Sequence, residues 1–292
     1  GGPMKITVLS GKGGTGKTTV ATNLALSLEN VQLMDADVEE PDDYIFIEPN
    51  FQNGYEAVNR LIPVINDEKC TACRKCVDFC EYNALALMLD NVLVFPEICH
   101  SCGGCARVCP VDAITEKERE VGRIRGDTSN RNLEFWQGEL NIGEEVSVPV
   151  IEQLKEHINE DKTVIIDAQP GTTCPTIEAA IDSDFCILVT EPTPFGLNDL
   201  RMAVEVIEGI NKPAGVVINR AEEEHDHIIE DYLQETGIPV LMKIPFERRI
   251  AELYSTGIPF VKEWPEWQEK FINMYSRIRG LVDNEKNYNY QR

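Results

Sequence analysis

The sequence predicts an α/β protein with a doubly wound, mostly parallel sheet that is interrupted by a small inserted α+β domain. Apolar, β-branched runs alternate with helical segments before about residue 62 and again after about residue 145. This alternation is typical of parallel strands covered by helices. Between the two stretches the alternation stops, and two cysteine-rich segments of identical spacing take its place.

Five continuous apolar runs are the expected strands: KITVLS, VQLMDAD, TVIIDAQ, DFCILVT and AGVVINR, which begin at residues 5, 31, 163, 184 and 214. Helices are expected between them over residues 16–28, 149–158, 196–210 and 228–237, the last ended by a glycine. A final helix over 264–282 carries apolar residues at helical spacing and is expected to dock onto the sheet rather than a membrane: Trp267, Phe271, Met274, Ile278 and Leu281.

The predicted domain boundaries follow from this alternation. We expect residues 4–62 and 119–283 to form one discontinuous α/β domain, 63–118 to form the inserted domain, and 284–292 to form a flexible tail. Within the second part, the stretch 119–144 is polar with scattered glycines, and we expect a connecting segment there.

The composition restricts the partners. The formal net charge is −23, which disfavours nucleic acid and anionic membranes because both attract Lys and Arg. No run approaches the roughly 18 apolar residues of a membrane-spanning helix. Met4 is followed directly by a strand sequence without a signal peptide, so we expect a cytoplasmic protein, in which ten cysteines are unlikely to pair as disulfides.

A phosphate-binding loop follows the first strand. GKGGTGKT, residues 11–18, fits the pattern G-x-x-x-x-G-K-[ST] between a strand and a helix. Its backbone N–H groups would cradle phosphates, Lys17 would neutralise their charge and Thr18 would hold Mg²⁺. The expected nucleotide-contacting residues are Gly11, Lys12, Gly13, Gly14, Thr15, Gly16, Lys17, Thr18 and Thr19.

The second lysine of this loop, Lys12, carries a resemblance. KGGTGKTT resembles the deviant phosphate loop of the MinD/ParA superfamily of ATPases, which includes the nitrogenase iron protein and the Mrp-type ATPases. In that superfamily the early lysine reaches the partner's nucleotide across a dimer interface. The resemblance therefore implies an ATP-dependent homodimer with Lys12 acting in trans, whereas chemistry alone also allows a solvated loop residue.

Carboxylates follow two of the strands. Asp35 and Asp37 end the second strand, and Asp167 ends TVIIDA, at the edge where α/β sheets bind ligands. By the resemblance, Asp37 orients the attacking water, Asp35 supports Mg²⁺ more remotely, Asp167 reaches Mg²⁺ through water, and the Gly171 N–H contacts the γ-phosphate. Capping of the following turn is the alternative for the first pair. Family-like adenine-side segments also suggest base contacts at Asn219, Arg220 and Pro245.

The inserted segment carries C-x2-C-x2-C-x3-C twice, at a constant offset of 29 residues. This is the signature of two-cluster bacterial ferredoxins, in which the fourth cysteine of each motif binds the other cluster. One 4Fe–4S cluster is thus expected on Cys70, Cys73, Cys76 and Cys109, and a second on Cys99, Cys102, Cys105 and Cys80. Zinc is the alternative metal, although its sites usually use two-plus-two spacing.

Two further cysteines lie outside the motifs. Cys174 follows Asp167 by seven residues, where the nitrogenase iron protein has a ligand of a cluster shared across its dimer. The second such ligand has no counterpart here, so we interpret Cys174 as a switch residue. Cys186 lies within the apolar run FCILV and is expected to be buried.

These features lead to three functional hypotheses. The first is an ATP-hydrolysing, Mg²⁺-dependent dimer whose nucleotide state controls electron transfer from two 4Fe–4S clusters to a partner protein. The second is an assembly factor for iron–sulfur clusters or metallocofactors. The third, a positioning ATPase acting on DNA or membranes, is disfavoured by the net charge.

Overall fold

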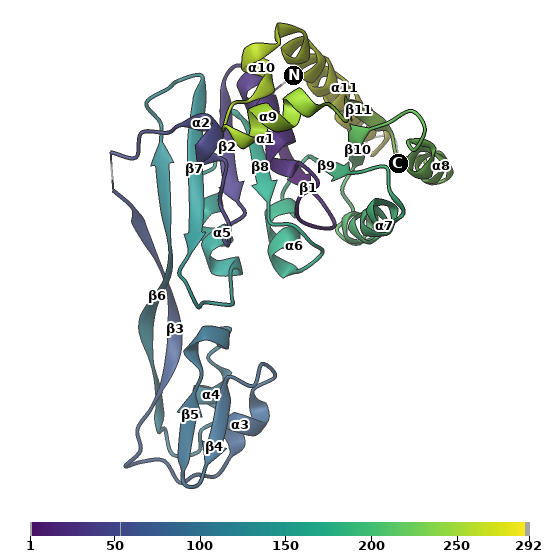
Figure 1. The fold of residues 1–292 in the computed structure, drawn as a ribbon. Coiled ribbons are helices and arrows are strands. Elements are labelled where there is room, and N and C mark those ends of the chain that lie inside the picture. The colour runs from purple at the N-terminus through teal and green to yellow at the C-terminus, as the bar shows by residue number, and fades with distance from the viewer. Residues whose placement is uncertain (1, 53, 290–292) are drawn as a thin grey trace.

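The computed structural model describes residues 2–52 and 54–289, with side chains described as far as residue 284. Its main feature is a nine-stranded sheet with the order β11-β10-β9-β1-β8-β2-β7-β6-β3 (Figure 1). The five predicted strands are confirmed and are mutually parallel: β1 (Lys5–Leu9), β2 (Val31–Ala36), β8 (Thr163–Ala168), β9 (Phe185–Thr190) and β10 (Ala214–Ala221). β11 (Val240–Pro245) and β7 (Leu133–Leu140) extend the parallel part on either side.

Helices cover both faces of the parallel strands, and each face has its own apolar core. One face packs against α1 (Lys17–Ser27), α9 (Arg248–Ser255), α10 (Phe260–Glu263) and α11 (Pro265–Asn289). The other packs against α5 (Val148–Lys155), α6 (Cys174–Ala180), α7 (Pro194–Gly209) and α8 (His227–Thr236). The predicted doubly wound α/β class is confirmed, because helices cover both faces of the parallel strands.

The C-terminal helix packs on the sheet as predicted. Trp267, Phe271, Met274 and Ile278 are all buried in the core formed with α1. α11 continues to Asn289, so helix occupies much of the tail that was expected to begin at 284, and residues 290–292 lie outside the described residues. Within the described ranges, no helix combines the length and the apolar character that crossing a membrane requires.

The prediction of a connecting segment over residues 119–144 is wrong. This region forms most of β6 (Ile114–Asp127) and all of β7, which pair antiparallel. Its charged residues are paired across the strands, as in the contact of 2.7 Å between the Arg123 guanidinium and the Glu139 carboxylate. Such cross-strand ion pairs allow a strand with few apolar residues at the edge of a sheet.

At that edge, β3 (Glu56–Ile65) and β6 form a long antiparallel ribbon that projects from the sheet (Figure 1). At its far end is the cysteine lobe, defined as residues 66–113, with α3 (Lys75–Phe79), β4 (Leu85–Met88), β5 (Asn91–Val94), a 3₁₀ turn (Pro96–Ile98) and α4 (Gly104–Arg107). The lobe has small apolar clusters of its own. The boundaries expected at 62/63 and 118/119 fall inside the two strands of the ribbon.

Candidate nucleotide site and two cysteine-lined cavities

The phosphate loop connects β1 to α1, and its backbone requires glycine. Gly14 and Gly16 have φ angles of 78° and 97°, a region that other residues rarely adopt. A Cβ at Gly16 would collide with the side chain of Asn219, whose amide donates a hydrogen bond of 2.8 Å to the Thr15 carbonyl oxygen. Asn219, predicted near the base, thus also braces the loop from β10.

Two carboxylates converge on the first turn of α1. The Thr18 hydroxyl oxygen lies 2.9 Å from Asp42 Oδ1 and 2.8 Å from Asp167 Oδ2. One hydroxyl proton can satisfy only one of these two acceptors. Lys17 is 6 % exposed, and its ammonium lies 3.8 Å from Asp37 Oδ2. The structure therefore brings together Lys17, Thr18, Asp37 and Asp167, which the sequence placed in the site, and adds Asp42.

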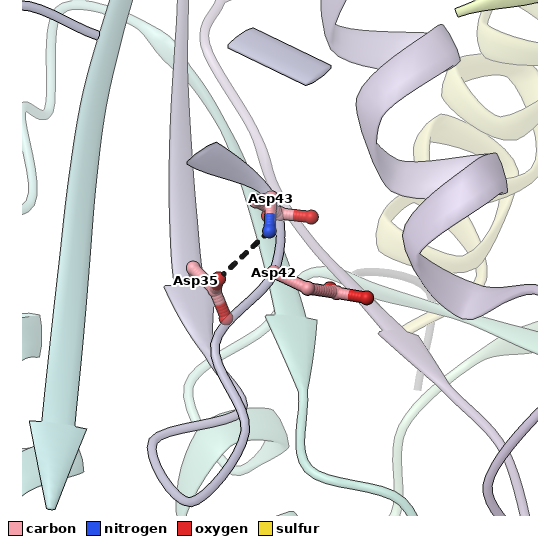
Figure 2. A group of neighbouring side chains, drawn as sticks. All are labelled: Asp35, Asp42 and Asp43. Carbon is pink, nitrogen blue, oxygen red and sulfur yellow. Dashed lines mark hydrogen bonds between the residues drawn. The ribbon is translucent and has the colours of Figure 1, made fainter. Parts of the chain in front are cut away.

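Figure 2 shows a second group of carboxylates, Asp35, Asp42 and Asp43, which shares Asp42 with the first. Asp35 accepts hydrogen bonds of 3.1 Å from the backbone N–H groups of Asp37 and Asp43. Oxygen atoms of Asp35, Asp42 and Asp43 lie within 4.8 Å of one another. Asp43 is fully buried, and among the described residues neither of its carboxylate oxygens has a hydrogen-bond partner; the same holds for Oδ1 of Asp167. Orphaned carboxylate oxygens beside a threonine hydroxyl fit a hard divalent cation such as Mg²⁺.

The crowding of these carboxyl groups is visible in their pKa values. Burial, reinforced by the neighbouring carboxylates, raises the pKa of Asp35 and Asp43 well above the ordinary value. Burial also raises the pKa of Asp37 to about 7, although the Lys17 ammonium opposes the shift. For Lys17, burial would lower the pKa, but Asp167 and Asp37 outweigh it and the pKa is raised. Lys17 is thus held as a cation, and the excess negative charge favours binding of a further cation.

Asp42 and Asp43 were missed at the level of sequence. They follow Pro41 in the segment that leads from β2 to the short helix α2 (Tyr44–Ile47). The signal was present in the run EEPDD, but the spacing alone did not show that the chain turns back toward the phosphate loop. The fold closes this turn because the Asp43 N–H donates to Asp35.

A cavity of about 530 Å³ opens beside the loop, between β10, β11 and α9. Three predicted base contacts, Asn219, Arg220 and Pro245, line it together with Gly14, Gly16 and Thr19. Phe246, which is 66 % exposed, and Tyr254 also line this cavity and were not predicted. Aromatic rings beside a phosphate loop provide a surface on which a nucleobase can stack.

The remaining predicted residues lie around the loop in separate positions. Lys12 is 40 % exposed, and its ammonium lies 3.6 Å from Asp199 on α7. The Gly171 N–H donates a hydrogen bond of 2.9 Å to the Ser10 carbonyl oxygen, within the chain. Cys174 is exposed at the first residue of α6, whereas Cys186 is buried within β9 as expected.

The eight motif cysteines line two separate cavities in the cysteine lobe. The first cavity is lined by Cys70, Cys73, Cys76 and Cys109, and the second by Cys80, Cys99, Cys102 and Cys105. Each lining set takes three cysteines from one motif and the fourth from the other, which matches the ligand sets predicted from the spacing. The second cavity is the larger, about 380 Å³ against about 10 Å³.

The donor sets fit iron–sulfur clusters by their chemistry. All ten cysteines of the chain, which lie within the described ranges, are free thiols. Backbone N–H groups of Ser101 and Ala113 point at the sulfurs of Cys99 and Cys109, at 3.4 and 3.3 Å. Hydrogen bonds of this kind stabilise the reduced state of thiolate-bound clusters. Tyr82 stacks on His100 beside the second cavity, with ring centroids 3.5 Å apart.

Comparison with known proteins assigns the nucleotide-binding part. Residues 6–260 match the model of the CobQ/CobB/MinD/ParA nucleotide-binding domain. The chain belongs to this family. Among its members, two uncharacterized proteins of Methanocaldococcus jannaschii are each 30 % identical, one over 98 % of this chain and 97 % of its own length and the other over 96 % and 98 %. Together with the fold, this match identifies a MinD/ParA-like nucleotide-binding domain.

More distant relatives bear functional names. The iron–sulfur cluster carrier protein of Pyrococcus horikoshii is 25 % identical over 94 % of this chain and 88 % of its own length. In structure, the septum site-determining protein MinD of Pyrococcus horikoshii, solved with Mg-ADP, matches 96 % of this chain and 97 % of its own with a TM-score of 0.57 and 20 % identity. At this level of identity, the structural match shows only that the two proteins share a fold.

Proposed function

We propose that this protein is an ATP-hydrolysing iron–sulfur protein in which nucleotide-driven dimerisation controls electron transfer from two 4Fe–4S clusters to a partner protein. One observation carries the proposal: the two cysteine motifs exchange their fourth members, so that each cavity is lined by four thiols. Four thiolates are the complete ligand set of a 4Fe–4S cluster, which supplies one-electron exchange when bound.

The nucleotide site is assigned from its contacts. Lys17 would bind the β- and γ-phosphates, and Thr18 would hold Mg²⁺ with Asp167 and Asp42 close by. Asp37 would orient the attacking water, since its carboxylate lies 3.8 Å from the Lys17 ammonium that would bind the β- and γ-phosphates. Asp35 holds the turn that carries Asp37. The base would enter the cavity lined by Asn219, Arg220 and Pro245.

Two further residues would respond to the nucleotide. The Gly171 N–H bonds to Ser10 in this structure, and exchanging this bond for one to the γ-phosphate would move the segment after β8. Lys12, exposed and held only by Asp199 among the described residues, would reach the nucleotide of a second subunit. Both steps would make the dimer depend on ATP.

A second function, as an iron–sulfur cluster carrier, is favoured by the names of the relatives at 23–25 % identity. A carrier must release its cluster, whereas an electron carrier retains it. The two functions are separated by incubating the loaded protein with an apo-ferredoxin and, separately, with a one-electron acceptor such as a viologen dye. Our proposal expects ATP to change the rate of acceptor reduction while iron stays bound; transfer of iron that ATP accelerates would instead support the carrier.

The ligand exchange is tested by substituting Cys80. Its neighbours in sequence are Cys70, Cys73 and Cys76, but it lines the cavity of Cys99, Cys102 and Cys105. We expect about eight iron atoms per chain in the native protein. Cys80→Ser should disturb the paramagnetic resonance signal of the second cluster and leave that of the first unchanged, and Cys73→Ser should do the reverse.

Cys174→Ser is the matched control, because Cys174 is exposed on α6 outside the lobe and should leave both signals intact. Loss of the first signal on Cys80→Ser, or two zinc ions in place of iron, would contradict the assignment.

A further inference from the structure

A buried arginine lies on the apolar side of β3. The alternate residues Val58, Arg60 and Ile62 are all buried, at 1 %, 5 % and 4 % exposure. Period-two alternation places them on one face of the strand. Burying an arginine without partners costs several kcal/mol, on the order of the desolvation penalty of an ion, so its contacts must compensate the charge.

These contacts converge on the segment that ends at Cys99. The Arg60 guanidinium donates hydrogen bonds to the carbonyl oxygens of Pro96 and Glu97, at 2.8 and 3.0 Å, and to that of Cys99. One guanidinium therefore fixes three carbonyl groups in the four residues that lead into the first thiol of the second motif. Burial lowers the pKa of His100, and the nearby Arg60 guanidinium lowers it further.

The charge of Arg60 is balanced by Glu144. The two side chains lie 2.6 Å apart and are 2 % and 3 % exposed. Glu144 also accepts a hydrogen bond of 2.8 Å from Arg119, which pairs with Glu97 at 3.0 Å. Two arginines and two glutamates thus form a neutral group beside the second cavity, and removal of any one member leaves a net charge there.

Glu144 belongs to the other part of the molecule. It lies in the loop between β7 and α5, where the Glu145 N–H also bonds to the Glu97 carbonyl at 3.4 Å. The same loop ends at Ser147, whose hydroxyl lies 3.4 Å from the side chain of Gln169, two residues before Gly171. The pair therefore connects the second cavity to the ATPase body, whereas among the described residues no buried ion pair of this kind lies beside the first cavity.

We propose that Arg60 is a positioning residue for the Cys99 ligand, and that its balance with Glu144 sets the reduction potential of the second cluster relative to the first. This inference rests on the proposed binding of two clusters. A reduced cluster carries one more negative charge than an oxidised one, and a nearby positive charge in a buried site stabilises it. Removing the negative charge of Glu144 should therefore raise the reduction potential of the second cluster, and removing the positive charge of Arg60 should lower it.

The test is a redox titration of the loaded protein, following the paramagnetic resonance signals of both clusters. Glu144→Gln keeps the shape and one of the two acceptor oxygens but leaves a net positive charge; Arg60→Met removes the positive charge. We expect the reduction potential of the second cluster to rise in Glu144→Gln and to fall in Arg60→Met. Each shift should change the ratio of reduced to oxidised cluster at a fixed potential about tenfold, which corresponds to 59 mV for one electron.

Two further variants separate charge from fold. Arg60→Lys keeps the charge without the forked geometry. In this variant the reduction potential of the second cluster should lie closer to the native value than it does in Arg60→Met. If Arg60→Met fails to fold, Glu144→Gln still tests the sign of the charge effect, and Arg60→Lys still tests the geometry. Arg123→Met is the matched control, because Arg123, on β6 of the same ribbon, pairs with Glu139 on β7, away from the Cys99 segment.

Each remaining outcome has one meaning. Shifts of the same sign in Glu144→Gln and Arg60→Met, equal shifts of both clusters, or an equal shift in the Arg123→Met control would overturn the inference and leave the proposed function standing. Absence of both clusters from the native protein, by iron analysis, would overturn the proposed function and the inference together.

Discussion

At the scale of single residues, the two lysines of the phosphate loop differ in their surroundings. Lys17 is nearly buried, and the carboxylates of Asp37 and Asp167 raise its pKa. Lys12 is 40 % exposed and has one ion pair, to Asp199. A buried lysine among carboxylates is suited to binding phosphate within its own subunit, whereas an exposed lysine at the mouth of the loop can reach outward.

This contrast predicts separable effects. Lys12→Ala should leave ATP binding within about threefold of the native affinity, because a single exposed ion pair is worth under about 1 kcal/mol. It should abolish the ATP-induced dimer. Lys17→Ala, the matched variant in the same loop, should lose ATP binding by at least tenfold. Light scattering after size exclusion with ATP and Mg²⁺ measures the mass, and an unchanged dimer mass in Lys12→Ala would refute the role in trans.

At the scale of elements, α11 shows how an amphipathic pattern becomes stability. Phe271 is fully buried against α1 and α10, and the adjacent Ile272 is 40 % exposed. The spacing of the apolar residues was sufficient to predict this face, because a helix repeats every 3.6 residues. β6 and β7 could not be predicted in the same way, since their charged side chains pair only when the two strands lie side by side.

Substitutions on the two faces of α11 should therefore differ strongly in cost. Phe271→Ala should lower the free energy of unfolding by about 3–5 kcal/mol through lost burial and a cavity. Ile272→Ala should change it by no more than about 1 kcal/mol, since its side chain is already partly in solvent. Urea unfolding followed by circular dichroism measures both, and similar costs at the two positions would contradict the packing described for α11.

At the scale of the whole molecule, the cysteine lobe is an insertion at the end of a ribbon. Ile65 and Ile114 are paired directly across β3 and β6, and the Asn66 N–H bonds to the Ala113 carbonyl at 2.7 Å. The chain therefore leaves and returns at the same point (Figure 1). Closing the ribbon with a tight turn leaves the strand pairing of the main sheet untouched.

This geometry predicts the effect of removing the lobe. Replacing residues 66–113 by an Asn-Gly turn, which favours two-residue hairpins, should give a folded protein that binds ATP with native affinity and contains no iron. Isothermal titration with ATP and iron analysis measure the two properties. Loss of ATP binding in the shortened chain would show that the lobe is part of the nucleotide-binding fold. Full-length protein with Cys76 and Cys105 both changed to Ser controls for loss of metal without loss of the lobe.

The candidate site could be predicted where its residues lie close together in the sequence. The phosphate loop and the residues that end β2 and β8 are each contained in a few consecutive positions, so their spacing is visible in the sequence. Asp42, Asp43, Phe246 and Tyr254 were not predicted, because they reach the site through turns whose direction depends on contacts such as that of Asp43 with Asp35.

The sequence by itself determined the parallel strands, the phosphate loop and the two sets of four cysteines. The periodicity of apolar residues and the spacing of ligand residues are both properties of neighbouring positions. Only the tertiary structure decided that residues 119–127 and 133–140 are strands, that Asp42 contacts Thr18, and that Arg60 pairs with Glu144. These features depend on partners from about 20 to more than 80 residues away, and their charges look solvent-exposed until the fold pairs them. The buried ion pair between Arg60 on the ribbon and Glu144 in the loop before α5 thus depends on the topology. The two sets of four cysteines, in contrast, can be recognised from the sequence.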